Sequence, residues 1–375
     1  MPRIVTAVAQ PRRVVSVVGT RPNFMKTAPV VAQLARRDGE FEPVLVHTGQ
    51  HYDDAMSRIF LEELRIGAPD HFLDVGSGPH GQQTARVMER LEPLLAELRP
   101  DLVIVPGDVN STLAAALTAA KLNIPVAHVE AGLRSWDRTM PEEINRLLTD
   151  QIAELLFIHS PEARDNLMRE GRPADSIHAV GNTMIDTLVA MRERIEALDA
   201  PAAHGLERGG YVVVTLHRPA LVDDPELLGQ AMARLDDVAA ELEVVFPVHP
   251  RTRANLARFG IEPRSRRVRL LEPLGYLDFL GLVFGAAGVL TDSGGIQEET
   301  TFLGIPCFTL RDTTERPVTV DQGTNTLLGL EPARIAEVPA LIESTRSRPA
   351  SVPEGWDGHA AERVVEVLSR SAARV

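Results

Sequence analysis

Three acidic residues in the first half of the chain lie just after apolar runs or at the start of a helical segment, where side chains of α/β proteins often bind ligands. Asp108 closely follows the apolar run Leu102–Val105, and Glu130 directly follows the next such run. Glu142 lies early in a segment with helical spacing. Burying a carboxylate disfavours its charged form unless a cation lies nearby, and carboxylates held in that way serve as general acids and bases. These residues therefore predict that three carboxylates converge on one functional pocket at the carboxyl-end edge of a sheet.

Cationic residues occur close to the same positions. Arg21 and Lys26 follow the turn at Gly19, where the first apolar run leads into a helical pattern. Such a turn directs backbone N–H groups and the positive end of a helix toward an anion. Arg146 lies four residues after Glu142 and therefore shares its helix face. The turn carries neither the G-x-G-x-x-G fingerprint nor a P-loop G-K-[ST], which disfavours NAD or ATP as the ligand.

Two histidines mark the second half of the chain. His217 and His249 each follow an apolar run. The carboxyl ends of neighbouring parallel strands meet at one edge of a sheet, so two histidines there favour a ligand site over isolated structural roles. Their spacing does not resemble a zinc site, and we expect no metal.

The segment T-D-S-G-G-I-Q-E-E predicts a diphosphate site. Ser293 suits the N-cap of a helix, and Gly294 and Gly295 would let a diphosphate approach the N–H groups of the first turn. Glu299 lies within that helix, where a carboxylate suits the paired hydroxyls of a ribose. Arg316, farther along, is a candidate phosphate clamp.

Alternating strands and helices must position these residues. We predict buried strands at Val14–Val18, Pro43–His47, Leu102–Val105, Pro125–Val129, Leu155–His159, Tyr211–Thr215, Val244–Val248, Val268–Leu271, Gly288–Thr291 and Pro306–Leu310. Helical patterns separate them, so the predicted fold class is α/β, with two Rossmann-like domains and a central cleft. The predicted boundaries are 1–12 for a flexible N-terminus, 13–185 for the first domain, 186–209 for a linker, 210–357 for the second domain and 358–375 for a C-terminal helix.

Composition narrows the class of protein. A chain of 375 residues exceeds what one hydrophobic core usually supports, which favours two domains. The net charge of −13 argues against nucleic acid as a partner. We expect no membrane span, because no apolar run approaches the roughly 20 residues that one needs. The single cysteine, Cys307, excludes an internal disulfide framework and fits a reducing cytoplasm.

The chain resembles the non-hydrolysing UDP-N-acetylglucosamine 2-epimerase family from Gly19 to about Gly329. The resemblance rests on eight motifs in order: G-T-R-P-x-x-x-K, G-D-x-N-S-T, H-V-E-A-G-L-R, P-E-E-I-N-R, L-H-R-P, P-V-H-P, D-S-G-G-I-Q-E-E and R-D-T-T-E-R-P. It implies a GT-B-like fold, a homodimer, and no NAD or metal. It also implies anti elimination of UDP to a 2-acetamidoglucal, then re-addition that interconverts UDP-N-acetylglucosamine and UDP-N-acetylmannosamine for polysaccharide biosynthesis.

The resemblance also implies residue roles at matching positions. UDP would be held by Ser293, Gly294, Gly295, Glu299 and Arg316, with Phe279 near the uracil. The sugar and diphosphate would be surrounded by Arg21, Lys26, Asp108, Glu130, Glu142, Arg146 and His217. A second, activating UDP-N-acetylglucosamine would lie near Gln50, His51, Arg218 and His249. The chain departs from the family after the second-domain His-Arg, where Ala220 and Leu221 replace a polar pair.

Three other functions fit parts of the pattern. A GT-B glycosyltransferase shares the fold and the UDP site, but it needs an acceptor pocket and has no need of three carboxylates around the sugar. A hydrolysing epimerase would release free N-acetylmannosamine and UDP. A catalytically silent sugar-nucleotide sensor is disfavoured by Lys26 and by the three carboxylates.

Overall fold

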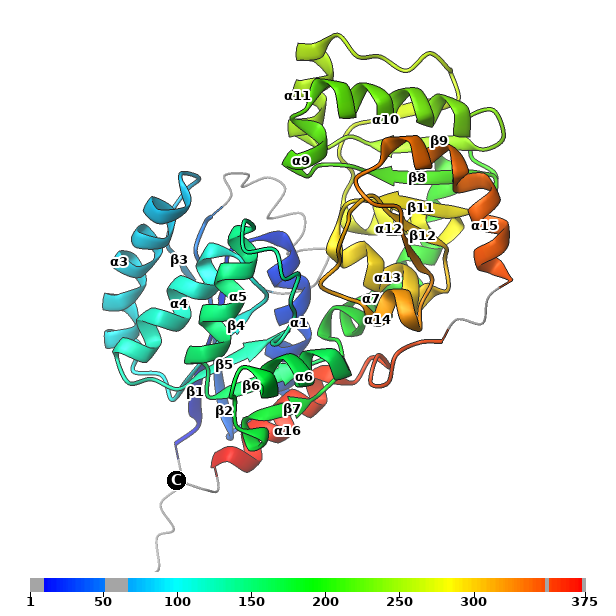
Figure 1. Ribbon diagram of the computed structural model, residues 1–375. Coiled ribbons are helices and arrows are strands. Elements are labelled where there is room, and N and C mark those ends of the chain that lie inside the picture. Colours follow the sequence, from blue (N-terminus) through cyan, green and yellow to red (C-terminus); the bar gives the residue numbers. More distant parts are fainter. Residues whose placement is uncertain (1–9, 51–66, 348–350, 373–375) are drawn as a thin grey trace, which may run out of the picture. The chain divides into compact units, whose positions relative to one another are not determined.

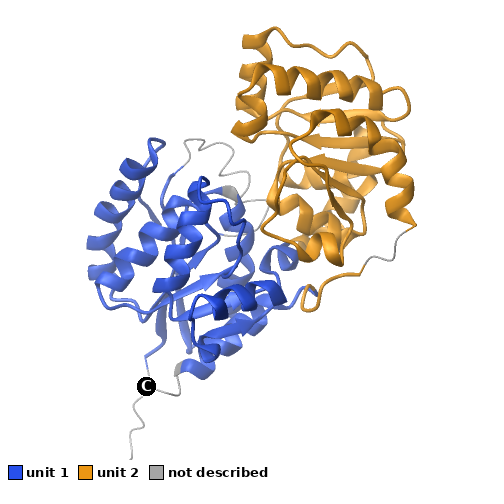
Figure 2. Ribbon diagram, viewed as in Figure 1, with its two compact units in different colours: residues 1–187, 357–375 blue, residues 188–356 orange. Residues whose placement is uncertain are grey.

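The computed structural model describes residues 10–50, 67–347 and 351–372 (Figure 1). The chain divides into two compact units (Figure 2). Unit 1 comprises Met1–Thr187 and Asp357–Val375, and unit 2 comprises Leu188–Trp356. In the described ranges, no helix is both long and apolar enough to cross a membrane.

Unit 1 is built on a parallel sheet of seven strands in the order β3-β2-β1-β4-β5-β6-β7. Its strands are β1 (Arg12–Val18), β2 (Phe41–His47), β3 (His71–Phe72), β4 (Leu102–Pro106), β5 (Val126–Val129), β6 (Leu155–Ile158) and β7 (Ile177–Ala179). Its helices are α1 (Arg21–Arg36), α3 (His80–Leu98), α4 (Asn110–Lys121), α5 (Pro141–Ile152), α6 (Pro161–Arg169), the 3₁₀ turn η1 (Ala174–Ser176) and α16 (Ala360–Ala372). Helix α7 (Thr183–Leu198) carries the chain from unit 1 into unit 2.

Unit 2 repeats this architecture with six parallel strands in the order β10-β9-β8-β11-β12-β13. These strands are β8 (Tyr211–Thr215), β9 (Glu243–Pro247), β10 (Val268–Leu271), β11 (Gly288–Thr291), β12 (Cys307–Thr309) and β13 (Asn325–Leu327). The helical segments are α8 (Ala200–Ala203), α9 (Pro219–Val222), α10 (Pro225–Val238), α11 (Pro250–Phe259), α12 (Tyr276–Gly285), α13 (Gly294–Leu303), α14 (Val318–Asp321), η2 (Pro332–Glu337) and α15 (Val338–Arg346).

Hydrophobic packing covers both faces of the unit 1 sheet. Along β1, Val15 and Val17 pack in one cluster with Leu91 of α3, and Val14 packs in another with Leu34 of α1 and Leu368 of α16. Alternate residues of a strand point to opposite faces, so a continuous valine run serves both clusters. The C-terminal helix α16 therefore belongs to the core of unit 1.

The strand order reverses once in each sheet, between β1 and β4 in unit 1 and between β8 and β11 in unit 2. At such a switch point the loops from adjacent strands diverge, and ligands of α/β proteins bind at that edge. The prediction of two Rossmann-like α/β domains is confirmed. The ten predicted strands are present with ends shifted by no more than two residues, and the structure adds the short strands β3, β7 and β13. Residues 186–209, predicted as a linker, include most of α7 and all of α8.

Candidate active site

A buried ion pair stands at the switch point of unit 1. Nζ of Lys26, on α1, lies 2.7 Å from Oε2 of Glu130, which directly follows β5, and both side chains are less than a tenth exposed. Gly107, after β4, makes room for the ammonium, because a Cβ there would lie only 3.1 Å from Nζ. Glu130 has a φ of 70°, a left-handed conformation that is uncommon for non-glycine residues. Lys26 thus supplies the compensating cation that a buried carboxylate requires.

A second ion pair links Asp108 to helix α5. Nη1 of Arg146 lies 2.5 Å from Oδ2 of Asp108, while Nε and Nη2 lie 3.0 Å and 2.6 Å from Oε2 of Glu143. The Arg146 side chain is only 2% exposed, whereas that of Asp108 is 23% exposed. A guanidinium fork that spans two carboxylates has a fixed orientation. Arg146 therefore holds Asp108 in place at the sheet edge.

Glu143 is a buried carboxylate beside Arg146 that the sequence analysis did not select. Its carboxylate accepts hydrogen bonds from the backbone N–H groups of Ser135 and Trp136, at 2.9 and 3.0 Å. Burial opposes the charge, but the Ser135 N–H and Arg146 outweigh it and lower the pKa of Glu143. Glu142, the residue selected from its spacing to Arg146, is half-buried in the first turn of α5. The i,i+3 spacing of Glu143 and Arg146 on the buried helix face was the available signal.

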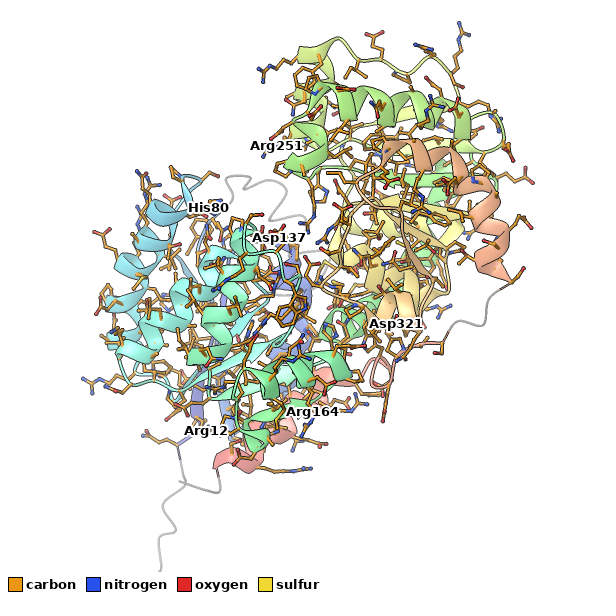
Figure 3. The ribbon with its side chains drawn as sticks, in the orientation of Figure 1. Arg12, His80, Asp137, Arg164, Arg251 and Asp321 are labelled. Carbon is orange, nitrogen blue, oxygen red and sulfur yellow. The ribbon has the colours of Figure 1, made fainter. Side chains whose placement is uncertain are left out.

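The remaining predicted residues of unit 1 are only partly described. Oε1 of Gln50 accepts hydrogen bonds from the backbone N and Oγ of Ser111, at 3.2 and 2.6 Å, so this amide supports the turn between β4 and α4. Arg21 is the first residue of α1, and its side chain lies outside the described part. His51 lies outside the described residues. In Figure 3, Arg12 at the start of β1 and Asp137 in the loop after β5 lie at opposite ends of the strands of the unit 1 sheet.

Unit 2 has a histidine–aspartate pair at its own switch point. Nδ1 of His217 lies 2.9 Å from Oδ1 of Asp292, and Oδ2 of Asp292 accepts the backbone N–H groups of His217 and Arg218 at 2.7 Å. Burial works against ionisation, but His217 and these N–H groups lower the pKa of Asp292. The ring of His249 lies 5.6 Å from that of His217. The structure thus brings His217 and Arg218 to Asp292, which the sequence analysis had not selected, and places His249 beside His217.

The departure at residues 220 and 221 has a structural explanation. Leu221, in α9, is 1% exposed and belongs to the hydrophobic core of unit 2. Its neighbour Ala220 is exposed. Leu221 therefore fixes the short helix α9 to the core beside Arg218, whereas nothing in the structure explains the alanine at position 220.

The N-terminus of α13 meets Arg316 closely. Ser293 occupies the N-cap position, and Gly294 and Gly295 form the first turn. A Cβ on Gly294 would lie 2.6 Å from Nη1 of Arg316, so glycine is required there for the guanidinium to reach the helix end. Nε of Arg316 lies 3.0 Å from Oε1 of the fully buried Glu298. A cation and free helix N–H groups at one position form a site for a phosphate group.

Glu299 lies deeper in the same helix. Its Oε1 accepts a hydrogen bond from the hydroxyl of Tyr276, at 3.0 Å. Burial raises the pKa of Glu299 to about 8, against the opposing effect of the Tyr276 hydrogen bond. Phe279, half-buried, follows Tyr276 within α12. Glu298, Tyr276 and Asp292 have partners far away in sequence, which spacing alone does not indicate.

Known proteins similar to this chain share its length and fold. A sequence profile described as UDP-N-acetylglucosamine 2-epimerase matches residues 33–369. The UDP-N-acetylglucosamine 2-epimerase of Methanococcus maripaludis is 40% identical over 361 residues, which cover 94% of this chain and 97% of that protein. The UDP-2,3-diacetamido-2,3-dideoxy-D-glucuronate 2-epimerase of Pseudomonas aeruginosa is 40% identical over 367 residues, covering 96% and 99%. The crystal structure of Methanocaldococcus jannaschii UDP-GlcNAc 2-epimerase in complex with UDP-GlcNAc and UDP superposes with a TM-score of 0.88, at 39% identity, covering 96% and 99%.

Proposed function

The chain belongs to the UDP-N-acetylglucosamine 2-epimerase family, and from this premise we propose that it inverts carbon 2 of UDP-N-acetylglucosamine or a closely related UDP-2-acetamido sugar without hydrolysing it. The observation that supports this proposal most strongly is the pairing of Glu130 with Lys26 and of Asp108 with Arg146 at one sheet edge. A nearby cation favours the charged form of a carboxylate, which is the form that accepts a proton.

The reaction needs such a site because the hydrogen on carbon 2 is barely acidic. As the bond between carbon 1 and the UDP oxygen breaks, its electron pair leaves with UDP and carbon 1 gains oxocarbenium character. A carboxylate then removes the carbon 2 proton, and that C–H electron pair forms the double bond of a 2-acetamidoglucal. Protonation of carbon 2 from the opposite face, with return of the UDP oxygen to carbon 1, gives the epimer. UDP is both leaving group and nucleophile, so no atom is lost.

We propose that unit 1 supplies the proton transfers and unit 2 holds UDP. Asp108, Glu130 and Glu142 share the two transfers, and Lys26 and Arg146 bring positive charge to the departing diphosphate. In unit 2 the α13 N-terminus with Arg316 binds the diphosphate, and Glu299 binds the ribose. His217, oriented by Asp292, contacts the diphosphate or the sugar. The activating site near Gln50, Arg218 and His249 stays a prediction.

Solvent deuterium tests the reaction. The protein is incubated with UDP-N-acetylglucosamine in heavy water without an acceptor, and both epimers are followed by proton NMR. We expect UDP-N-acetylmannosamine to form with deuterium at carbon 2, because the abstracted proton exchanges with solvent before it returns. A product that carries no solvent deuterium overturns the elimination mechanism.

The same spectra separate the two rival enzymes. A hydrolysing epimerase yields free N-acetylmannosamine and UDP in equal amounts. A glycosyltransferase leaves the sugar nucleotide unepimerised until an acceptor is added. The epimerase proposal requires that the sugar stay attached to UDP throughout.

The sugar itself is the finer part of the proposal. Two relatives equally similar to this chain, at 40% identity, carry the names of a UDP-N-acetylglucosamine and a UDP-2,3-diacetamido-uronate epimerase. A panel with both UDP-sugars in the same deuterium assay ranks them by kcat/KM. We expect UDP-N-acetylglucosamine to rank first, and a preference of more than tenfold for the uronate would reassign the substrate.

Assembly and location complete the proposal. We propose that the protein is a homodimer that supplies sugar nucleotides for polysaccharide synthesis, which the family resemblance supports. We also propose that it works in the cytoplasm, which the single buried cysteine supports. Light scattering coupled to size exclusion measures the mass of the particle. A mass of one chain, about half that expected, would reject the dimer.

A further inference from the structure

Unit 1 contains a fully buried histidine and aspartate on β5 and α5, the elements next to the two ion pairs described above. His128, in β5, and Asp150, in α5, each have a fully buried side chain. Nδ1 of His128 lies 2.7 Å from Oδ1 of Asp150, and Nε2 lies 2.7 Å from the backbone oxygen of Gly107. Both ring nitrogens of His128 are therefore engaged at short distance.

The partners of the ring determine its protonation. A backbone carbonyl oxygen can only accept a hydrogen bond, and an ionised carboxylate likewise only accepts. A neutral imidazole has one N–H group and one lone pair, so one of the two contacts would bring a lone pair against an acceptor. A doubly protonated imidazolium satisfies both contacts.

Asp150 is held in its ionised form by three donors. Besides His128, its Oδ2 accepts the backbone N–H of Gly132 at 3.1 Å and lies 2.7 Å from Nη2 of Arg134. Burial opposes the charge of Asp150, but His128 and Arg134 together lower its pKa. Arg134 in turn donates to Glu170 at 2.8 and 2.5 Å. With a protonated His128, two cations and two anions would balance, which would remove the large cost of an unpaired buried charge.

His128 and Asp150 contact the backbone of the two turns that carry the proposed catalytic carboxylates. These are the turn after β4, which contains Asp108, and the turn after β5, which contains Glu130. Gly107, with a φ of 64°, immediately precedes Asp108, and its carbonyl accepts from His128. Gly132, with a φ of 80°, follows Glu130 by two residues, and its N–H donates to Asp150. A Cβ at Gly132 would lie 2.5 Å from the Ala163 oxygen, so this turn is also closely packed.

We propose that His128, kept as an imidazolium, and Asp150 are positioning residues that jointly hold the Asp108 and Glu130 turns in register. This inference rests on the proposed function, because it gives the two residues a task in the carbon 2 proton transfers. His128 and Asp150 act through the backbone of Gly107 and Gly132 and do not touch the substrate. A change at either residue moves the two carboxylates relative to one another while leaving the UDP site of unit 2 unaltered.

Nitrogen-15 NMR of the full chain tests the protonation state without any substrate. At about pH 8, where an ordinary histidine is neutral, we expect one histidine with both ring nitrogens at imidazolium shifts. That signal disappears in the His128→Gln variant, and if this variant does not fold, Asp150→Asn is used to move it. A spectrum in which all histidines are neutral at this pH overturns the imidazolium assignment.

Kinetics of Asp150→Asn tests the positioning role. The amide keeps the shape of the side chain but removes the charge shared by His128 and Arg134. We expect kcat for deuterium incorporation at carbon 2 to fall at least tenfold, with KM within about threefold of wild type, and UDP affinity measured by calorimetry unchanged. An unchanged kcat overturns the role, as does a loss of UDP affinity that parallels kcat, since the latter indicates general unfolding.

Asp186→Asn is the matched control. Asp186 is another buried aspartate of unit 1 that accepts two backbone N–H groups, those of Ala360 and Ala361, at 3.1 and 2.7 Å. Neither group belongs to the Asp108 or Glu130 turn, so we expect kcat to stay at the wild-type value. Wild-type protein that incorporates no deuterium at all would refute the proposed function instead, and the NMR result would still decide the state of His128.

Discussion

The ammonium of Lys26 and the carboxylate of Glu130 lie 2.7 Å apart, at 7% and 4% side-chain exposure. They come from α1 and from the turn after β5, separated by more than a hundred residues. Each charge reduces the cost of burying the other. The pair therefore contributes both to the stability of unit 1 and to the proposed proton transfer. Substitutions of the two residues can separate these contributions.

Lys26→Met leaves the Glu130 charge buried without its lysine. We expect the free energy of unfolding to fall by about 3–5 kcal/mol and carbon 2 exchange to be lost. The double variant Lys26→Met with Glu130→Gln removes both charges and should regain most of that stability but none of the activity. Denaturant unfolding and the deuterium assay measure the two quantities. A single variant as stable as wild type would contradict the coupling.

Arg146→Lys tests the guanidinium fork between Asp108 and Glu143. A lysine keeps the positive charge but cannot reach both carboxylates in one fixed geometry. We expect kcat to fall about 100-fold, the size of a lost general acid–base contribution, with UDP affinity unchanged. Arg192→Lys is the control, because Arg192 forms an exposed pair with Glu196 in α7 that contributes little. Equal kcat values for the two variants would remove Arg146 from the mechanism.

The sequence predicted which side chains lie at the edge of the unit 1 sheet better than it predicted the contacts among them. Continuous apolar strands and the carboxyl-edge rule were enough to bring Lys26, Asp108 and Glu130 to one sheet edge. The rule of i,i+4 spacing selected Glu142, whereas burial of the adjacent helix face makes Glu143 the partner of Arg146. Which face of a helix is buried depends on tertiary packing, and a single sequence does not specify it.

The missed strands and second-domain contacts have related causes. Strands β3 and β13 contain two and three residues, too few for a periodic pattern. Asp292 lay inside a recognised motif, but its partner His217 is 75 residues away in sequence. The role of a carboxylate whose hydrogen-bond donors lie far away in sequence can be recognised only once the strands are placed next to each other.

Glu299 gives unit 2 a pH-dependent stability. Burial raises its pKa from 4.5 to about 8, so the folded state favours the neutral acid. This contribution to stability is fully present below pH 4.5 and is lost as the pH rises to about 8. In Glu299→Gln the group does not titrate. The unfolding free energy of wild type minus that of the variant should fall by a few kcal/mol across this window, and a flat difference would contradict the raised pKa.

Asp186→Ala should loosen the C-terminal helix α16. The carboxylate accepts the N–H groups of Ala360 and Ala361 at the start of that helix. Without an acceptor these buried N–H groups lose their bonds, and we expect a cost of about 1–2 kcal/mol. Hydrogen exchange should speed up first in the amides of α16. Faster exchange spread evenly over unit 1 would instead indicate a global defect.

Gly294→Ala separates the UDP site from the fold of unit 2. The added Cβ would lie 2.6 Å from Nη1 of Arg316, closer than such atoms approach. The contact is with the end of a flexible side chain, so the guanidinium can move away while the backbone stays in place. Arg316 would then leave its position at the N-terminus of α13, although Glu298 still binds its Nε.

We expect this displacement to weaken UDP binding about tenfold in calorimetry, the equivalent of roughly 1.4 kcal/mol. The melting temperature should change little, because the new methyl group meets no backbone atom at close range. Gly229→Ala, in α10 of the same unit, is the control, since its Cβ would have only an ordinary contact at 3.8 Å with Ile261. It should raise stability slightly, as alanine does within helices, and leave UDP affinity alone. If Gly294→Ala bound UDP as tightly as Gly229→Ala, Arg316 would have no part in holding the diphosphate.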